Sequence, residues 1–294
     1  MAGAAAARQD RPLFSAESAL VVLHVNVKDG KNVAKAAYVG GLTQDAFEVF
    51  EDGARQAISF FTTEDSPVTV GLLIDSSGSM QPNRARVITA ATVFAEASNP
   101  DDDLFALTFN ETVRSAFPDS APFTGDPVQL RDAVTRIFNA YGRTALFDAV
   151  AAGVDYLGRG HHERKVLVVV SDGGDNASHV TFDQVLTTTE ATNVVIYTVA
   201  LVDPLERDAN PKLLKRIAEA SGGEAFEPTS SGQMTQVLQR IARDIRHTYT
   251  VGYASSNEAR DGSFRKIRVS VHAPDGRRLV VRTRAGYLAA RNLR

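Results

Sequence analysis

The feature that most constrains the fold of this chain is the alternation of short apolar segments with amphipathic ones in its central part. Val68–Ile74 is a continuous apolar run, which is typical of a strand that is buried on both faces of a sheet. Leu104–Phe109, Lys165–Val170 and Val194–Leu201 are predicted to be further strands. Helices are expected in the intervening and following stretches, at 83–97, 128–140, 145–157, 182–191, 212–220 and 231–246. Strands that alternate with helices predict an α/β domain with a doubly wound, mostly parallel sheet covered by helices on both faces.

Both ends of the chain show strand patterns without a convincing helix. Apolar and polar residues alternate along 19–27, as in a strand with one polar face. Neither end alone has enough apolar surface for a good core of its own. We therefore expect 17–65 and 247–290 to form one small, split β domain of the sandwich type, with the α/β domain inserted at 66–246. Residues 1–16 and 291–294 are expected to be flexible. Further strands are predicted at 47–50, 58–61, 249–253, 264–272 and 279–283, and Tyr249, Tyr253 and Tyr287 are expected to pack inside this domain.

Composition excludes several classes of function. The 32 Lys and Arg residues nearly balance the 35 Asp and Glu residues, so no global field favours binding to nucleic acid or to a membrane surface. The chain has no cysteine, which excludes disulfides, thiolate metal sites and cysteine nucleophiles. No apolar run reaches the roughly 18 residues that a membrane span requires. The small-residue run at the start, within MAGAAAARQDRPLF, resembles the last residues before a signal cleavage site.

Positive charge is concentrated near the C-terminus, where residues 260–294 hold ten Arg or Lys residues against two Asp residues. Strands with one solvated face often carry such charge, and this is the interpretation that we favour. The alternative is a docking surface for an acidic partner.

Oxygen-bearing side chains follow two of the predicted buried strands at the point where each strand ends. The carboxyl ends of parallel strands are where open α/β sheets bind ligands. Gly78 allows the backbone to turn tightly between Ser77 and Ser79. A third segment, 142–149, places Thr144 just ahead of a predicted helix. A cluster made only of oxygen ligands suits a hard cation such as Mg²⁺. The predicted metal ligands are Asp75, Ser77, Ser79, Thr144 and Asp172.

Taken together, these segments resemble the von Willebrand factor type A domain and its metal-ion-dependent adhesion site. That family has Asp-x-Ser-x-Ser after its first strand, a later threonine, and an aspartate after its fourth strand. The flanking segments 41–53 and 261–287 resemble a bacterial group of related proteins that surround this Rossmann-like domain with strands. The sequence matches the metal-site motif, in the family's order, at Asp75, Ser77, Ser79, Thr144 and Asp172.

The resemblance implies a mechanism of binding. Ser77, Ser79 and Thr144 would offer neutral hydroxyl ligands, whereas Asp75 and Asp172 would act largely through bound waters. With few carboxylates in direct contact the metal stays electron-poor, so its vacant position attracts a Glu or Asp carboxylate from a protein partner. We therefore expect an adhesion-type binding module that is not an enzyme and is extracytoplasmic, either periplasmic or secreted. Mg²⁺ is the expected metal, and Mn²⁺ or Ca²⁺ are alternatives.

Other interpretations fit parts of the pattern. A strand-end aspartate also begins the motif of haloacid dehalogenase-like phosphoryl-transfer enzymes, but that chemistry needs a second aspartate where this chain has Ser77. A further alternative is that the metal only rigidifies a scaffold whose β domain binds the partner. Thr144 alone is also a good helix N-cap. Asp175 is expected to have a loop role, and Asp101–Asp103 are expected to form a solvated connection.

Overall fold

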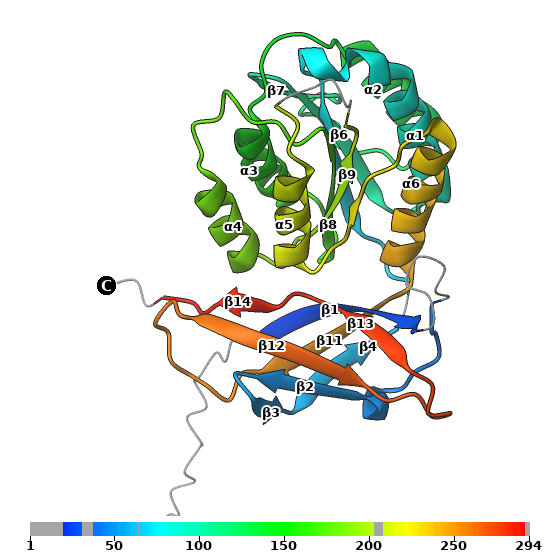
Figure 1. Ribbon diagram of the computed structural model, residues 1–294. Coiled ribbons are helices and arrows are strands. Elements are labelled where there is room, and N and C mark those ends of the chain that lie inside the picture. Colours follow the sequence, from blue (N-terminus) through cyan, green and yellow to red (C-terminus); the bar gives the residue numbers. More distant parts are fainter. Residues whose placement is uncertain (1–19, 31–37, 64, 203–207, 292–294) are drawn as a thin grey trace, which may run out of the picture.

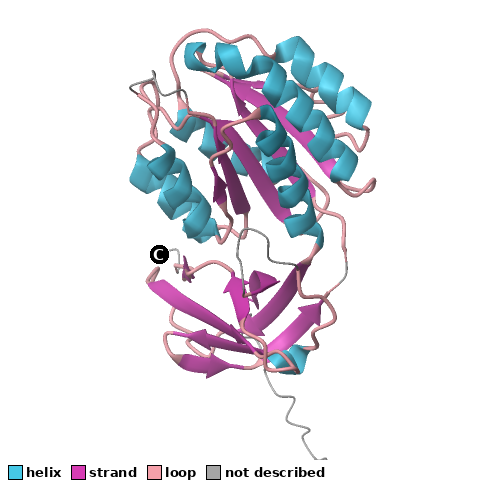
Figure 2. Ribbon diagram, turned by 45° about the vertical axis from the view of Figure 1, so that its right-hand side comes forward, coloured by secondary structure: helices cyan, strands magenta, loops and turns pink. Residues whose placement is uncertain are grey.

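The computed structural model describes residues 20–30, 38–63, 65–202 and 208–291. It consists of an α/β unit stacked on a smaller β unit (Figures 1 and 2). The ends predicted to be flexible lie outside the described residues, except for Arg291, which forms an isolated β-bridge with Asp261. No helix in these ranges has the length and apolar character needed to cross a membrane.

The central sheet of the α/β unit has six strands in the order β10-β9-β8-β5-β6-β7. All neighbouring strands are parallel except β7, which is antiparallel to β6 at the edge. The predicted fold class, an α/β fold with a mostly parallel sheet, is confirmed. The strands are β5 (Thr69–Asp75), β6 (Asp103–Phe109), β7 (Val113–Ser115), β8 (Lys165–Ser171), β9 (Val195–Ala200) and β10 (Ala225–Phe226).

Helices cover both faces of this sheet, as Figure 2 shows. Successive β5 side chains point to opposite faces. Leu72 packs in a core with residues of α1, α2 and α6, and Leu73 packs in a second core with residues of α3 and α5. Gly222 ends α5, predicted as the helix at 212–220, in a left-handed conformation with φ of 82°. The helices are α1 (Arg84–Ala97), α2 (Pro127–Ile137), α3 (Leu146–Leu157), α4 (Phe182–Ala191), α5 (Pro211–Ser221) and α6 (Ser231–Arg246).

The β unit contains two antiparallel sheets of four strands each, in the orders β13-β1-β11-β4 and β14-β12-β2-β3. Strands from both ends of the chain pair directly, since β1 lies beside β11 and β2 lies beside β12. Tyr249 and Tyr253 are buried in the core between the sheets and Tyr287 packs against it, as predicted. The strands are β1 (Leu20–Asp29), β2 (Phe47–Glu51), β3 (Ala54–Gln56), β4 (Ile58–Thr62), β11 (Thr248–Ala254), β12 (Phe264–Val271), β13 (Leu279–Arg282) and β14 (Gly286–Leu288).

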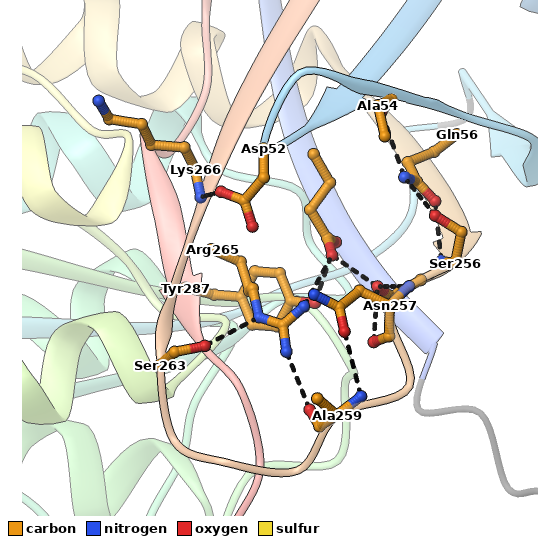
Figure 3. A network of polar contacts seen from close by, with 12 residues as sticks. Asp52, Ala54, Gln56, Ser256, Asn257, Ala259, Ser263, Arg265, Lys266 and Tyr287 are labelled. Atoms are coloured by element: carbon orange, nitrogen blue, oxygen red, sulfur yellow. Dashed lines mark hydrogen bonds and ion pairs between the residues drawn. The ribbon is translucent and has the colours of Figure 1, made fainter.

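Part of the C-terminal positive charge lies inside the protein. Arg265 is only 2% exposed, beside the equally buried Glu51, and it donates to Ser263 Oγ at 3.1 Å and to the Ala259 carbonyl at 2.9 Å (Figure 3). Arg284 is also buried and donates to the carbonyl of Thr192, directly after α4. The prediction of a solvated charged face is wrong for these two residues, because each binds carbonyl or carboxylate oxygens that come together only in the tertiary fold.

A cluster of charged side chains joins the two units. Lys28 of β1 lies 3.1 Å from Asp244 Oδ2 of α6, and Arg282 of β13 donates to the same oxygen at 2.5 Å. Glu224 forms ion pairs with Arg282 and with Arg240, the latter at 2.7 Å. The carboxylate of Asp244 is fully buried. We call these five residues the interface charge cluster.

A half-buried histidine at the same junction, His24, predicts sensitivity to acid. Burial, together with the charges of Arg164 and Arg284, lowers the pKa of His24 from 6.5 to about 3, and Lys165 lines the same small cavity. Between these pKa values the unfolded chain binds a proton that the folded chain excludes, so stability falls as the pH falls. We expect a loss of about 1.4 kcal/mol in unfolding free energy per pH unit below 6.5 from this residue.

The measurement is urea unfolding of the wild type and His24→Gln at pH 7 and pH 5. The wild type should lose about 2 kcal/mol more than the variant between these two conditions. His179→Gln is the control, because the side chain of His179 is 95% exposed. Equal losses in the wild type and in His24→Gln would contradict the assignment.

Candidate metal centre

The predicted ligands meet at the edge of the sheet where the parallel strands end. Asp75 is the last residue of β5, and Asp172 directly follows β8, which pairs with β5 in parallel. This edge lies at the end of the α/β unit that is far from the β unit (Figure 1). Four of the five predicted ligands line one cavity of about 130 Å³, and these are Ser77, Ser79, Thr144 and Asp172.

Asp75 is the predicted ligand that does not line the cavity, and it is completely buried. Its Oδ1 accepts a hydrogen bond from the backbone nitrogen of Ser77 at 2.8 Å, and its Oδ2 accepts one from Ser171 Oγ at 2.6 Å. Burial raises the pKa of Asp75 to about 6, and the nearby charge of Asp172 acts in the same direction. These two hydrogen bonds fix the orientation of the Asp75 carboxylate.

Asp172 reaches the cavity directly. Its Oδ2 accepts a hydrogen bond from Ser79 Oγ at 2.6 Å, and its Oδ1 accepts one from the backbone nitrogen of Gly174 at 2.9 Å. The hydroxyls of Ser77 and Ser79 lie 3.2 Å apart. Asp172 is thus held by one backbone group and one of the predicted hydroxyl ligands.

Thr144 comes from the loop before α3, between β7 and β8 in the chain. Its backbone nitrogen donates to Asn176 Oδ1, and its carbonyl accepts from the backbone nitrogen of Asn176, both at 2.9 Å. The N-cap of α3 is Ala145, with no side-chain hydrogen bond at the cap. The alternative role of Thr144 as the helix N-cap is therefore wrong, and the residue lines the cavity instead.

The donor set fits a hard divalent cation. Neighbouring oxygens around an octahedral Mg²⁺ lie about 3 Å apart. The corresponding separations here are 3.2 Å between the serine hydroxyls and 2.6 Å between Ser79 and Asp172. Within residues 20–30, 38–63, 65–202 and 208–291, no group of three or more His, Asp or Glu side chains could hold a metal. Hydroxyls therefore have to supply part of any coordination here.

Sequence reasoning missed several residues that shape this site. Ser171 holds Asp75, and Asn176 and Asp208 line the cavity. Ser171 lies on β8, so its contact with Asp75 depends on strand pairing. Asp208 follows β9 and carries no motif of its own. Among the three, Ser171 and Asn176 lie within four residues of the predicted ligand Asp172, and this closeness in the sequence was the only available signal.

The two remaining acidic segments, at Asp175 and at Asp101–Asp103, have structural roles. The expected loop role of Asp175 is confirmed, because its Oδ1 accepts hydrogen bonds from Ser178 Oγ and the backbone nitrogen of Phe147. The prediction of a solvated connection is wrong for Asp102. This residue is 6% exposed and accepts hydrogen bonds from the backbone nitrogens of Val68 and Asn99, both at 2.9 Å.

Comparison with known proteins places this geometry among described folds. The sequence profile of the von Willebrand factor type A domain matches residues 69–240, and no curated protein matches the chain. A solved von Willebrand factor type A structure from Catenulispora acidiphila has a TM-score of 0.54 at 11% identity, covering 92% of this chain and 73% of that one. Proximal thread matrix protein 1 from the mussel byssus, solved with a zinc-occupied MIDAS motif (metal-ion-dependent adhesion site), has a TM-score of 0.52 at 14% identity. That match covers 66% of this chain and 49% of the byssus protein.

Proposed function

Because the chain belongs to the von Willebrand factor type A domain family, as its sequence predicted, we propose that it is a metal-dependent protein-binding module. Domains of this family are generally interaction modules without catalytic activity, and they commonly bind a divalent metal. In our proposal Ser77, Ser79 and Thr144 hold the metal through their hydroxyls, with Asp75 and Asp172 acting around them. The bound metal supplies an electrophilic position for a Glu or Asp side chain of a protein partner.

The observation that carries this proposal is that three neutral hydroxyl residues and one carboxylate, among the predicted ligands, line the cavity. Both carboxylates already accept hydrogen bonds from the protein, whereas the three hydroxyl ligands are neutral. Neutral ligands leave most of the charge of a divalent cation uncompensated, and this residual charge favours an incoming carboxylate. A site designed to hold a metal only for rigidity would gain more from direct carboxylate contacts.

Mg²⁺ is the metal that we propose, with Mn²⁺ or Ca²⁺ as alternatives. The predicted ligands are all oxygen atoms, and hard cations take such ligands. Zinc in proteins is most often bound by His and Cys, neither of which lines this cavity. The zinc-occupied motif of the mussel protein shows that a site of this family accepts zinc in that protein.

Replacing Thr144 with alanine tests whether the metal faces a partner. The variant loses one neutral ligand, so the dissociation constant for Mn²⁺, measured by calorimetry, should rise about tenfold. Metal-dependent binding of acidic peptides should be lost, while the urea-unfolding midpoint without metal stays unchanged. Thr187→Ala, on the exposed side of α4, is the control.

Other outcomes separate the alternative functions. A large loss of folding stability in Thr144→Ala, with peptide binding retained, would favour a metal that only rigidifies the scaffold. Turnover of p-nitrophenyl phosphate by the Mg²⁺-loaded protein would favour a phosphoryl-transfer enzyme and contradict the binding module.

We also propose an extracytoplasmic location, on the basis of the family. Cell fractionation with detection of the native protein tests this location.

A further inference from the structure

An exposed aromatic residue, Tyr141, directly precedes a residue that lines the metal cavity. Tyr141 is 44% exposed, although large aromatic side chains are usually more buried. Its backbone nitrogen donates to the carbonyl of Ser76 at 3.0 Å. Ser76 lies between the predicted ligands Asp75 and Ser77 in the sequence. The next residue, Gly142, lines the cavity, and its carbonyl accepts from the backbone nitrogen of Gly78 at 3.2 Å. The position of Tyr141 is therefore tied to the metal-binding loop itself.

The guanidinium group of Arg114 contacts the phenol of Tyr141. Arg114, in the edge strand β7, donates from Nη2 to the hydroxyl oxygen of Tyr141 at 3.0 Å. Because that oxygen acts as the acceptor, the phenol proton is available for another acceptor. Arg114 also has further N–H groups, and a guanidinium can bind a carboxylate with two parallel hydrogen bonds. The two side chains thus present several donors at one place.

Two arginines, one in contact with the phenol and one close to it in the sequence, supply positive charge here. Arg143 precedes Thr144 and donates to the Asn176 carbonyl. Within the part of the chain that the structure describes, no ion pair at or below 4.0 Å involves Arg114 or Arg143. Glu111 accepts a hydrogen bond from the backbone nitrogen of Arg143, and Asp172 and Asp208 line the cavity itself. Arg114 and Arg143 are both exposed, so their guanidinium groups can receive a negative group from a partner.

We propose that Tyr141 and Arg114 form a second anion-binding contact next to the metal, and that the partner is a protein segment carrying two carboxylates. One carboxylate reaches the metal, and the other accepts hydrogen bonds from the Tyr141 hydroxyl and the Arg114 guanidinium. This inference rests on the proposed function and adds a specificity to it. The rigid attachment of Tyr141 to the metal loop fixes the separation of the two contacts, so the spacing of the acidic residues in the partner should be fixed as well.

The test is a selection from a random peptide library on the immobilised full chain, in Mn²⁺ and in EDTA, followed by affinity measurements on the selected peptides by fluorescence anisotropy. Peptides that bind the wild type in Mn²⁺ should contain two acidic residues at a constant spacing. Neutralising one of the two residues should weaken binding about tenfold, because a hydrogen-bonded charge is lost. Tyr141→Phe and Arg114→Gln should remove this effect while leaving Mn²⁺ affinity unchanged. Arg268→Gln, in the β unit, controls for the change in net charge.

The outcomes distinguish this inference from the proposed function. Metal-dependent peptides with a single required acid, or equal affinities of Arg114→Gln and the wild type for diacidic peptides, would overturn the second contact and leave the metal-dependent function intact. Selection of no Mn²⁺-dependent peptide would overturn both. Loss of Mn²⁺ binding in Tyr141→Phe would also overturn the inference, because the residue would then act through the metal site.

Discussion

Replacing Asp244 with alanine is expected to lower the free energy of unfolding by about 3–5 kcal/mol. Asp244 is fully buried at the junction of the α/β unit with the β unit, where Lys28 and Arg282 both contact its Oδ2. Its removal leaves these two cationic groups with Glu224 as their remaining partner among the ion pairs of the interface charge cluster. Removing one partner of a buried ion pair is costly because the remaining charge is neither hydrated nor paired.

The pKa values of the cluster indicate where this cost comes from. Burial raises the pKa of Asp244 to about 6 and lowers the pKa of Lys28 to about 8. Both shifts disfavour the charged forms, so loss of solvation outweighs the attraction between the two groups. At pH 7 both groups remain charged. The large effect of Asp244→Ala should therefore arise mainly from the charges left behind, and Lys28→Met in the same chain should restore at least about 1 kcal/mol.

The measurement is urea unfolding followed by far-UV circular dichroism, since the chain contains no tryptophan. Asp132→Ala is the matched control, because Asp132 forms an exposed ion pair with Arg131 and its loss should cost less than about 1 kcal/mol. Equal effects of Asp244→Ala and Asp132→Ala would show that the cluster does not hold the two units together. An additive double variant would show that Lys28 and Asp244 are not coupled.

The fold was largely predictable because strands that are buried on both faces and strands that are buried on one face have different sequence patterns. Continuous apolar character in Val68–Ile74 identified a central strand with helices on both sides, and alternation in 19–27 identified a strand of another kind of sheet. β7 and β10 were missed, because two or three residues are too few to show a period. The helix predicted at 83–97 begins at Arg84, and the 3-10 helix that precedes it at Gly78–Asn83 was also missed.

Side-chain environments were less predictable than elements. The burial of Asp102 depends on the backbone nitrogens of Val68 and Asn99, and the burial of Arg265 depends on Glu51. Charged residues lie inside a protein only where distant segments supply partners, and the local sequence does not reveal these partners. The same reason explains the site, where motif positions located the five predicted ligands but not the strand pairing that brings Ser171 to Asp75.

Asp172→Ala is expected to weaken Mg²⁺ and Mn²⁺ binding at least about 100-fold, which would remove measurable binding in a calorimetric titration of the EDTA-stripped protein. Asp172 is the one predicted carboxylate that lines the cavity, and it also holds the hydroxyl of Ser79 at 2.6 Å. Its loss therefore removes a negative charge and releases a neutral ligand. Asp75→Asn should have a similar effect with the fold preserved, because the amide keeps the shape of the buried group while removing its charge.

Asp175→Ala provides the control for both variants, since Asp175 belongs to the same loop but accepts hydrogen bonds from Ser178 and from the start of α3. It should bind one metal ion with wild-type affinity. Saturable binding that survives in Asp172→Ala and Asp75→Asn would place the metal outside this cavity. If binding is lost in Asp175→Ala as well, the loop as a whole rather than the two carboxylates determines affinity. Loss confined to Asp172→Ala and Asp75→Asn would show that charge at these two positions holds the metal, and that the hydroxyls alone do not suffice.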